Sequence, residues 1–270
     1  MTTVAEMDFK KTTGKKNWRK QSFLILGAPK IGKSELFAQD SSIFLDIEGG
    51  LNLLDVVKFP KDRPFLDWDE LEQTVDSLVA MRHKGTFPSQ IDTIVIDTAT
   101  RLVNLATAKV LELLNNKFPN KNWEALEEVT IGGDKGNPGW AMRTNLVDNL
   151  LNKIKQLNCA MVVIGHIDNK KSKNEMGVEV EKQTISIGGN LGKAFCNNSD
   201  HILHFMSKVN AEGIITRTVR TLGTATLEAG SRGLVVPDRW ELVNPKSRKA
   251  EDLAEAAKAN YDKLKSFFAE

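Results

Sequence analysis

A glycine-rich segment, GAPKIGKS at residues 27–34, lies between the apolar run SFLILG and a stretch that begins a helix. It matches the pattern G-x-x-x-x-G-K-[ST], in which glycines let the backbone curl until successive N–H groups point at a phosphate. The lysine reaches the terminal phosphates and the serine hydroxyl binds Mg²⁺, so Lys33 is a candidate catalytic residue and Ser34 a metal ligand. The residues expected to contact a nucleotide are Gly27, Ala28, Pro29, Lys30, Ile31, Gly32, Lys33, Ser34 and Glu35.

Short apolar runs alternate with longer segments of helical period through most of the chain. The expected strands cover residues 23–27, 42–47, 92–97, 159–166, 200–205 and 214–220. The expected helices open at Lys33 and cover residues 67–84, 98–114 and 141–157. This order predicts an α/β fold with a mostly parallel, twisted sheet flanked by helices, in which ligands bind beyond the carboxyl ends of the strands.

Polar side chains follow three of these strands. Asp97 ends the run DTIVID and is the expected second ligand of Mg²⁺. Glu48 follows the strand at 42–47 and could orient an attacking water; Asp46 competes for that role but lies further from the carboxyl end. His166 ends VVIGH, where it could contact a γ-phosphate and report it to the next loop, or could be a structural histidine.

Composition limits the architecture and the partners. The 270 residues are 41% hydrophobic, enough for one large domain, and the net charge of +2 means that any nucleic-acid site must be local. We expect a flexible basic tail at 1–20, a core at 21–245 and an amphipathic C-terminal helix at 246–270 that packs on the core. No apolar run approaches the roughly 18 residues that span a membrane, which favours a cytoplasmic protein without a membrane partner.

Taken together, these segments resemble the RecA-like recombinase ATPases, and more closely the short phage-type members that contain little beyond the ATPase core. The resemblance runs from about residue 23 to 239 and rests on GAPKIGKS, FLDIEGGLN, DTIVIDT and VVIGH. It implies a RecA-like P-loop core that uses ATP and Mg²⁺, with Glu48 as the catalytic glutamate and Asp97 as the metal ligand. His166 stands at the sensor position, where the family commonly has glutamine.

Two long stretches, 118–140 and 168–190, are expected to be loops, and the resemblance implies that both contact single-stranded DNA. The candidate DNA contacts are Lys170, Lys171, Lys173, Lys182, Gly188, Gly189 and Asn190. Trp123 and Trp140 offer faces on which bases could stack. The alternative is that nearby glutamates dilute the basic charge and that both tryptophans belong to the core.

The segment AGSRGLVVPDRW resembles the part of RecA-like oligomers that carries a basic finger to the neighbouring subunit's nucleotide. Arg232 is the candidate finger, and a surface arginine is the alternative. The resemblance thus implies a homo-oligomer, either a ring or a filament.

The favoured hypothesis is an ATPase, stimulated by single-stranded DNA, that acts in recombination or strand annealing, with a single-strand-binding protein as a further partner. If the gene is phage-encoded, the expected location is the host cytoplasm. A replicative helicase or helicase-loading ATPase shares the same core. A small-molecule kinase is a third alternative, because a phosphate loop occurs there too.

Overall fold

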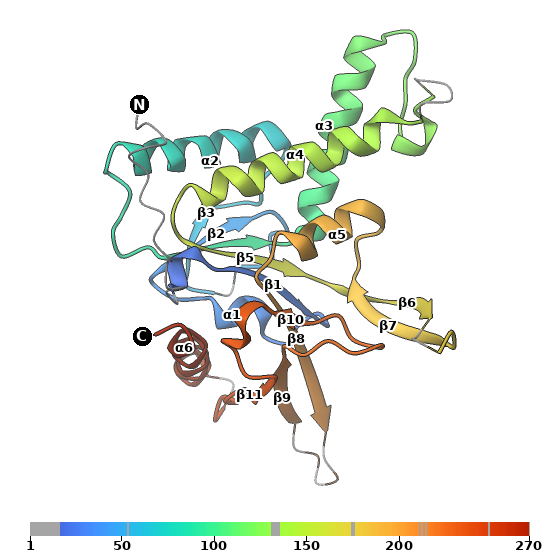
Figure 1. The fold of residues 1–270 in the computed structure, drawn as a ribbon. Coiled ribbons are helices and arrows are strands. Elements are labelled where there is room, and N and C mark those ends of the chain that lie inside the picture. The colour runs from blue at the N-terminus through green and yellow to red at the C-terminus, as the bar shows by residue number, and fades with distance from the viewer. Residues whose placement is uncertain are drawn as a thin grey trace, which may run out of the picture.

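The computed structural model describes residues 17–52, 54–130, 136–173, 176–209, 211, 213, 215–247 and 249–269. Within these residues, one large sheet has the strand order β11-β9-β8-β1-β5-β4-β2-β3, with β10 paired to β8 (Figure 1). Its strands are β1 (Ser22–Gly27), β2 (Ser42–Asp46), β3 (Val57–Phe59), β4 (Thr93–Asp97), β5 (Ala160–Gly165), β8 (His201–Val209), β9 (Ile215–Arg220), β10 (Gly230–Ser231) and β11 (Arg239–Glu241). The pairs from β3 to β8 are parallel, whereas β9, β10 and β11 add antiparallel pairs at one side.

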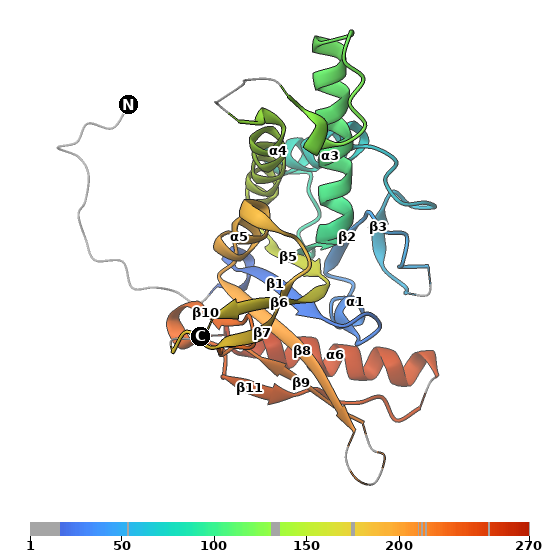
Figure 2. The same cartoon turned by 90° about the vertical axis from the view of Figure 1, so that its right-hand side faces the viewer.

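Helices cover both faces of this sheet. They are α1 (Lys33–Leu36), α2 (Trp68–His83), α3 (Ala99–Lys117), α4 (Pro138–Lys155), α5 (Gly189–Asn197) and α6 (Ala250–Ser266). Leu24 and Leu26 of β1 pack with α2, α3, α4 and α5, whereas Phe23 and Ile25 face α1 and α6. Figure 2 shows α3 and α4 on one side of the sheet and α6 on the other. Burial of alternate residues on both faces explains why β1 is a continuous apolar run.

The predicted fold class is confirmed. Each of the six apolar runs became a strand, and the segments between them became α1, α2, α3 and α4. The strands β3, β10 and β11 were missed because they are only two or three residues long and carry no distinctive apolar pattern. Helix α4 begins at Pro138, earlier than predicted, because Asn137 caps it by accepting a hydrogen bond from the Gly139 N–H.

The prediction of a loop at 168–190 is wrong for most of that range. Strands β6 (Ile167–Lys173) and β7 (Glu179–Ile185) form an antiparallel hairpin, and α5 begins at Gly189. Towards the tip of the hairpin Lys171 lies opposite Glu181 and Lys173 lies opposite Glu179, whereas an apolar pair, Ile167 and Ile185, closes its base. The other predicted loop, 118–140, contains a 3-10 turn at Leu126–Glu128, and its residues 131–135 lie outside the described residues.

The expected tail at 1–20 reaches too far into the chain. Residues 1–16 lie outside the described residues, but Trp18 is buried against Phe23 and Tyr261 and donates its indole N–H to Thr93 Oγ1 at 3.0 Å. An aromatic side chain held on both sides belongs to the core. In the C-terminal segment Tyr261, Leu264 and Phe268 are buried under the sheet. No helix among the described residues is long and apolar enough to cross a membrane.

A buried histidine at the start of β8 belongs to this aromatic cluster. The ring of His201 on β8 stacks on Phe23 at 5.1 Å and meets Phe268 edge-on at 5.1 Å. Its two nitrogens hydrogen-bond to Ser231 Oγ at 2.9 Å and Gln21 Oε1 at 3.0 Å. Burial lowers the pKa of His201 to about 4. The folded protein therefore holds this ring in its neutral form at pH 7.

Acid is therefore expected to destabilise the protein through His201. The unfolded chain takes up a proton near the ordinary pKa of 6.5, whereas the folded chain resists it until about 4. Stability is thus fully present above pH 6.5 and falls by up to about 3 kcal/mol as the pH drops towards 4. Urea unfolding at several pH values checks this, and a His201→Asn protein should lose less stability across the same pH range. An equally steep loss in that variant would assign the acid sensitivity to other groups.

Candidate functional site

The phosphate loop (residues 27–34) connects the carboxyl end of β1 to α1. The Lys33 side chain is 5% exposed and its ammonium donates hydrogen bonds to the carbonyls of Gly27 at 2.9 Å and Ala28 at 2.8 Å. Burial lowers the pKa of Lys33 to about 8, although the nearby charges of Asp97 and Glu48 act in the opposite direction. The loop therefore already curls around a buried cation, at the place where the motif puts the terminal phosphates.

Two glycines give the loop this shape. Gly32 has φ +95°, a backbone conformation that side chains disfavour, and a Cβ there would lie 2.6 Å from Arg217 Nη1. Gly27 leaves no room for a side chain because a Cβ would lie 2.9 Å from Phe205 Cβ. The spacing of the two glycines in the motif thus has a steric origin in this chain.

Ser34 and Asp97 meet across the end of the sheet. The Ser34 hydroxyl donates to Asp97 Oδ2 at 2.6 Å, although β5 lies between β1 and β4. Burial, with Glu48 and Asp46 nearby, raises the pKa of Asp97 to about 6, against the effect of the Ser34 hydrogen bond. A desolvated carboxylate beside a hydroxyl oxygen fits Mg²⁺, which prefers oxygen ligands. No group of three metal-ligating side chains occurs among the described residues, so Mg²⁺ would take its remaining ligands from phosphate and water.

Glu48 and His166 face each other beside this pair. The Glu48 carboxylate is partly exposed and lies 3.6 Å from His166 Nε2, while the Glu48 N–H donates to the Asp97 carbonyl at 3.1 Å. Asp46, the competing carboxylate, is fully buried and accepts hydrogen bonds from the Gly49 N–H and from Lys58. Asp46 is therefore used within the fold, and Glu48 is the carboxylate available to a water molecule.

The predicted residues that the structure brings together line one cavity of 490 Å³. Its walls include Pro29, Lys30, Gly32, Lys33, Ser34, Glu35, Glu48, Asp97 and His166. These side chains come from the ends of β1, β2, β4 and β5, which meet at the same edge of the sheet. A buried lysine, a metal-binding pair and an open carboxylate in one cavity can hold a nucleoside triphosphate and direct water at it.

Arg232 does not join this cavity. It lies next to β10, and its exposed guanidinium pairs with Asp200 at 3.1 Å. Asp200 also accepts hydrogen bonds from the N–H and hydroxyl of Ser22, the first residue of β1. Arg232 thus lies at the amino edge of the sheet, opposite the phosphate loop, and could reach a nucleotide only on another copy of the chain.

Some of the candidate DNA-binding residues form hydrogen bonds or ion pairs within the chain, and the others are exposed. Lys170 donates to the carbonyls of Ile185 and Ile187, and Lys182 pairs with Glu228 at 3.3 Å, so both charges are used within the chain. The exposed members are Lys171, Lys173, Gly188, Gly189 and Asn190. Trp123 is 7% exposed and packs with Leu114 and Leu126, which confirms the core alternative for this tryptophan. Trp140, by contrast, is 37% exposed.

Two residues behind the phosphate loop carry no signal in the sequence. Arg217 on β9 places its guanidinium against Gly32, and Asn260 on α6 holds the chain segment next to Arg217. Both lie more than 180 residues from Gly32, and neither belongs to a short motif. Only the folded sheet brings them to the site.

The fold and the cavity define a P-loop nucleoside triphosphatase. A family model described as an AAA domain matches residues 19–233, and the chain belongs to this family. Comparison with curated proteins gives no match. The family confirms the expected class of P-loop ATPase and supports nucleotide binding and hydrolysis, for which such domains usually employ Mg²⁺.

Proposed function

We propose that this protein is a RecA-like ATPase that binds single-stranded DNA and acts in recombination or strand annealing. The observation that carries the proposal is a short polypeptide connection between the nucleotide cavity and a depression next to Trp140. The proposal includes assembly into a ring or filament, with a single-strand-binding protein as a partner and the cytoplasm as the location.

On the nucleotide side, Lys33 would contact the terminal phosphates of ATP and Ser34 with Asp97 would hold Mg²⁺. The metal would neutralise phosphate charge as it develops during transfer. Glu48 would accept a proton from the attacking water, because its carboxylate is open to the cavity and close to His166. In an assembly, Arg232 of one copy would add positive charge at the nucleotide of the next.

On the DNA side, an 880 Å³ depression lies between the start of α4 and the start of α5. Trp140 and Arg143 line one wall and Gly188, Gly189 and Asn190 the other, and none of the described lining residues is acidic. The Arg143 guanidinium lies 4.6 Å from the centre of the Trp140 ring. An aromatic ring, a cation and open backbone suit an unstacked base and its phosphate, and such bases occur in single strands.

The two sides are connected by few residues. The Ser186 N–H donates to the His166 carbonyl at 2.9 Å, and its hydroxyl lies 3.2 Å from that of Thr100 at the start of α3. Gly188 follows two residues after Ser186. A shift of His166 on contact with a γ-phosphate would therefore pass directly to the backbone that lines the depression.

The test compares two exposed aromatic residues. Replacing Trp140 by alanine should weaken binding of a labelled oligothymidylate about tenfold, because stacking contributes roughly 1–3 kcal/mol per base. Phe59→Ala is the control, since Phe59 is 36% exposed, against 37% for Trp140, and lies on the distant edge strand β3. Fluorescence anisotropy at one fixed, low salt concentration gives both affinities.

The same proteins are assayed for ATP hydrolysis with and without the oligonucleotide. Stimulation of the wild-type protein by DNA, reduced in Trp140→Ala but not in Phe59→Ala, is the expected result. A rate of ATP hydrolysis that the oligonucleotide does not change at low salt would contradict the proposal. Turnover that instead requires a small metabolite would favour a kinase, and unwinding of forked DNA would favour a helicase.

A further inference from the structure

The helix that follows the phosphate loop is unusually short. Helix α1 has four residues. The Leu36 N–H donates to the Gly32 carbonyl, which closes one helical turn. A single turn is not stable by itself, because nucleation fixes several backbone dihedrals for one hydrogen bond. The loop must therefore be held by other parts of the chain.

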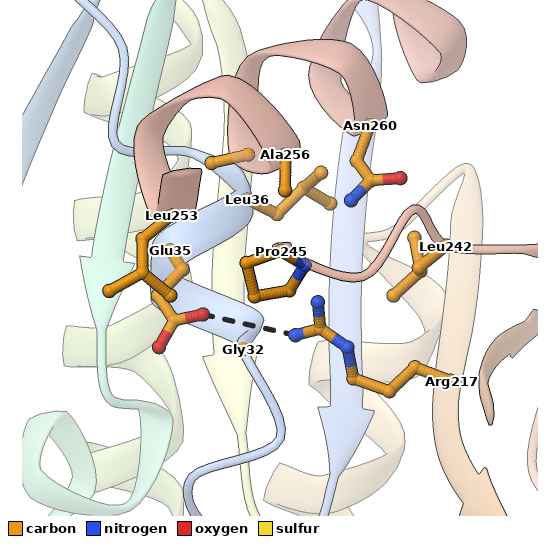
Figure 3. A pocket seen from close by; sticks show the side chains of 10 residues that line it. Gly32, Glu35, Leu36, Arg217, Leu242, Pro245, Leu253, Ala256 and Asn260 are labelled. Carbon is orange, nitrogen blue, oxygen red and sulfur yellow. Dashed lines mark ion pairs between the residues drawn. The ribbon is translucent and has the colours of Figure 1, made fainter. Parts of the chain in front are cut away.

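One such support is Arg217, which lies across the back of the loop (Figure 3). Its Nη1 lies 3.5 Å from the Ile31 carbonyl oxygen and 3.9 Å from Glu35 Oε2, and its side chain is largely buried. The absence of a side chain at Gly32 is what allows this approach, since a Cβ there would lie 2.6 Å from Nη1. The guanidinium thus touches both sides of the turn that leads into α1.

The other face of this guanidinium is fixed by the segment before α6. Its Nε donates to Asn244 Oδ1 at 2.9 Å and its Nη2 donates to the Val243 carbonyl at 3.2 Å. Val243 is held in turn by Asn260 of α6, which accepts from the Val243 N–H at 2.7 Å and donates to its carbonyl at 3.0 Å. Asn260 is buried, whereas the bonds from Arg217 to Asn244 and Val243 lie at the surface.

These contacts form a continuous chain from α6 through Val243 and Arg217 to the phosphate loop. Val243, Asn244 and Asn260 all lie beyond residue 233, where the match to the AAA domain ends. We propose that the segment C-terminal to the family domain is part of the nucleotide site, and that Arg217 and Asn260 are positioning residues that hold the phosphate loop ready for ATP. The inference concerns nucleotide binding and does not depend on the proposed interaction with DNA.

The test separates ATP binding from turnover in assays without DNA. Arg217→Ala should raise KM for ATP, and Kd for a fluorescent ATP analogue, about tenfold while kcat stays within about twofold, because Arg217 does not line the cavity that contains Glu48 and Asp97. Arg217→Lys should recover part of the loss, since one ammonium can replace only some of the guanidinium's hydrogen bonds. Arg239→Ala is the matched control, an exposed arginine on the adjacent strand β11.

Asn244→Ala provides a second, milder variant in case Arg217→Ala does not fold. It removes an exposed acceptor of the guanidinium and should raise KM about threefold. Melting curves without nucleotide accompany each measurement. An unchanged KM in the folded variants would overturn the proposal, as would a parallel fall of kcat, affinity and melting temperature, which would show that Arg217 serves general folding only.

Discussion

Replacing Glu48 by glutamine is expected to lower kcat for ATP hydrolysis by about 100-fold or more, with KM for ATP changed only a few-fold. Glutamine keeps the size of the side chain but cannot accept a proton from water. The backbone of residue 48 is fixed by its hydrogen bond to the Asp97 carbonyl, so the amide should occupy the same place as the carboxylate. Steady-state kinetics with Mg²⁺ and a fluorescent ATP analogue separate turnover from binding.

Glu112→Gln on the exposed face of α3 is the matched control for this charge change and should behave as wild type. If Glu48→Gln turned over ATP at the normal rate, another group would have to activate the water. A variant that lost binding and turnover together would instead place Glu48 among the nucleotide contacts.

The second large effect is expected for Lys33→Met. Hydrolysis should fall to background, and Mg²⁺–ATP should no longer raise the melting temperature, because the terminal phosphates lose their cation. The nucleotide-free protein should nevertheless keep its stability to within about 1 kcal/mol, since burial of the ammonium is unfavourable, as its lowered pKa shows, and methionine fills similar space. Loss of function without loss of stability distinguishes a site residue from a core residue.

Thermal melting with and without Mg²⁺–ATP measures both quantities in one experiment. Lys84→Ala, at the exposed end of α2, controls for loss of one positive charge. ATP hydrolysis at the normal rate by Lys33→Met would refute the assignment of the phosphate loop.

The sequence predicted the parallel sheet because its strands are buried on both faces. Such strands are continuous apolar runs, as in FLILG and TIVID, and turn and helix signals separate them clearly. The hairpin β6–β7 is different: its strands carry lysines opposite glutamates, a pattern that resembles a polar loop until the register is known. Strand pairing is a long-range property and could not be inferred from either strand alone.

The nucleotide site shows the same division. Lys33 and Ser34 belong to one short motif. Asp97, Glu48 and His166 lie at the ends of strands that were predicted to share one edge of the sheet, so their closeness to Lys33 and Ser34 could be predicted from the sequence. Arg217 carried no such signal, because its partners Ile31 and Val243 lie far from it in the chain. The contacts that engage Lys170 with the Ile185 carbonyl and Lys182 with Glu228 likewise depend on the fold.

The strand order has a consequence for synthesis of the protein. Strand β5 lies between β1 and β4 in the sheet but follows both in the chain, so the two halves of the Ser34–Asp97 pair emerge from the ribosome before the strand that joins them. Until residue 165 has been made, β1 and β4 have unpaired edges, and β1 waits longer still for β8. The nucleotide cavity is therefore incomplete until β5 has been made, and a nascent chain that stops before β5 would leave both edges of β1 and one edge of β4 unpaired.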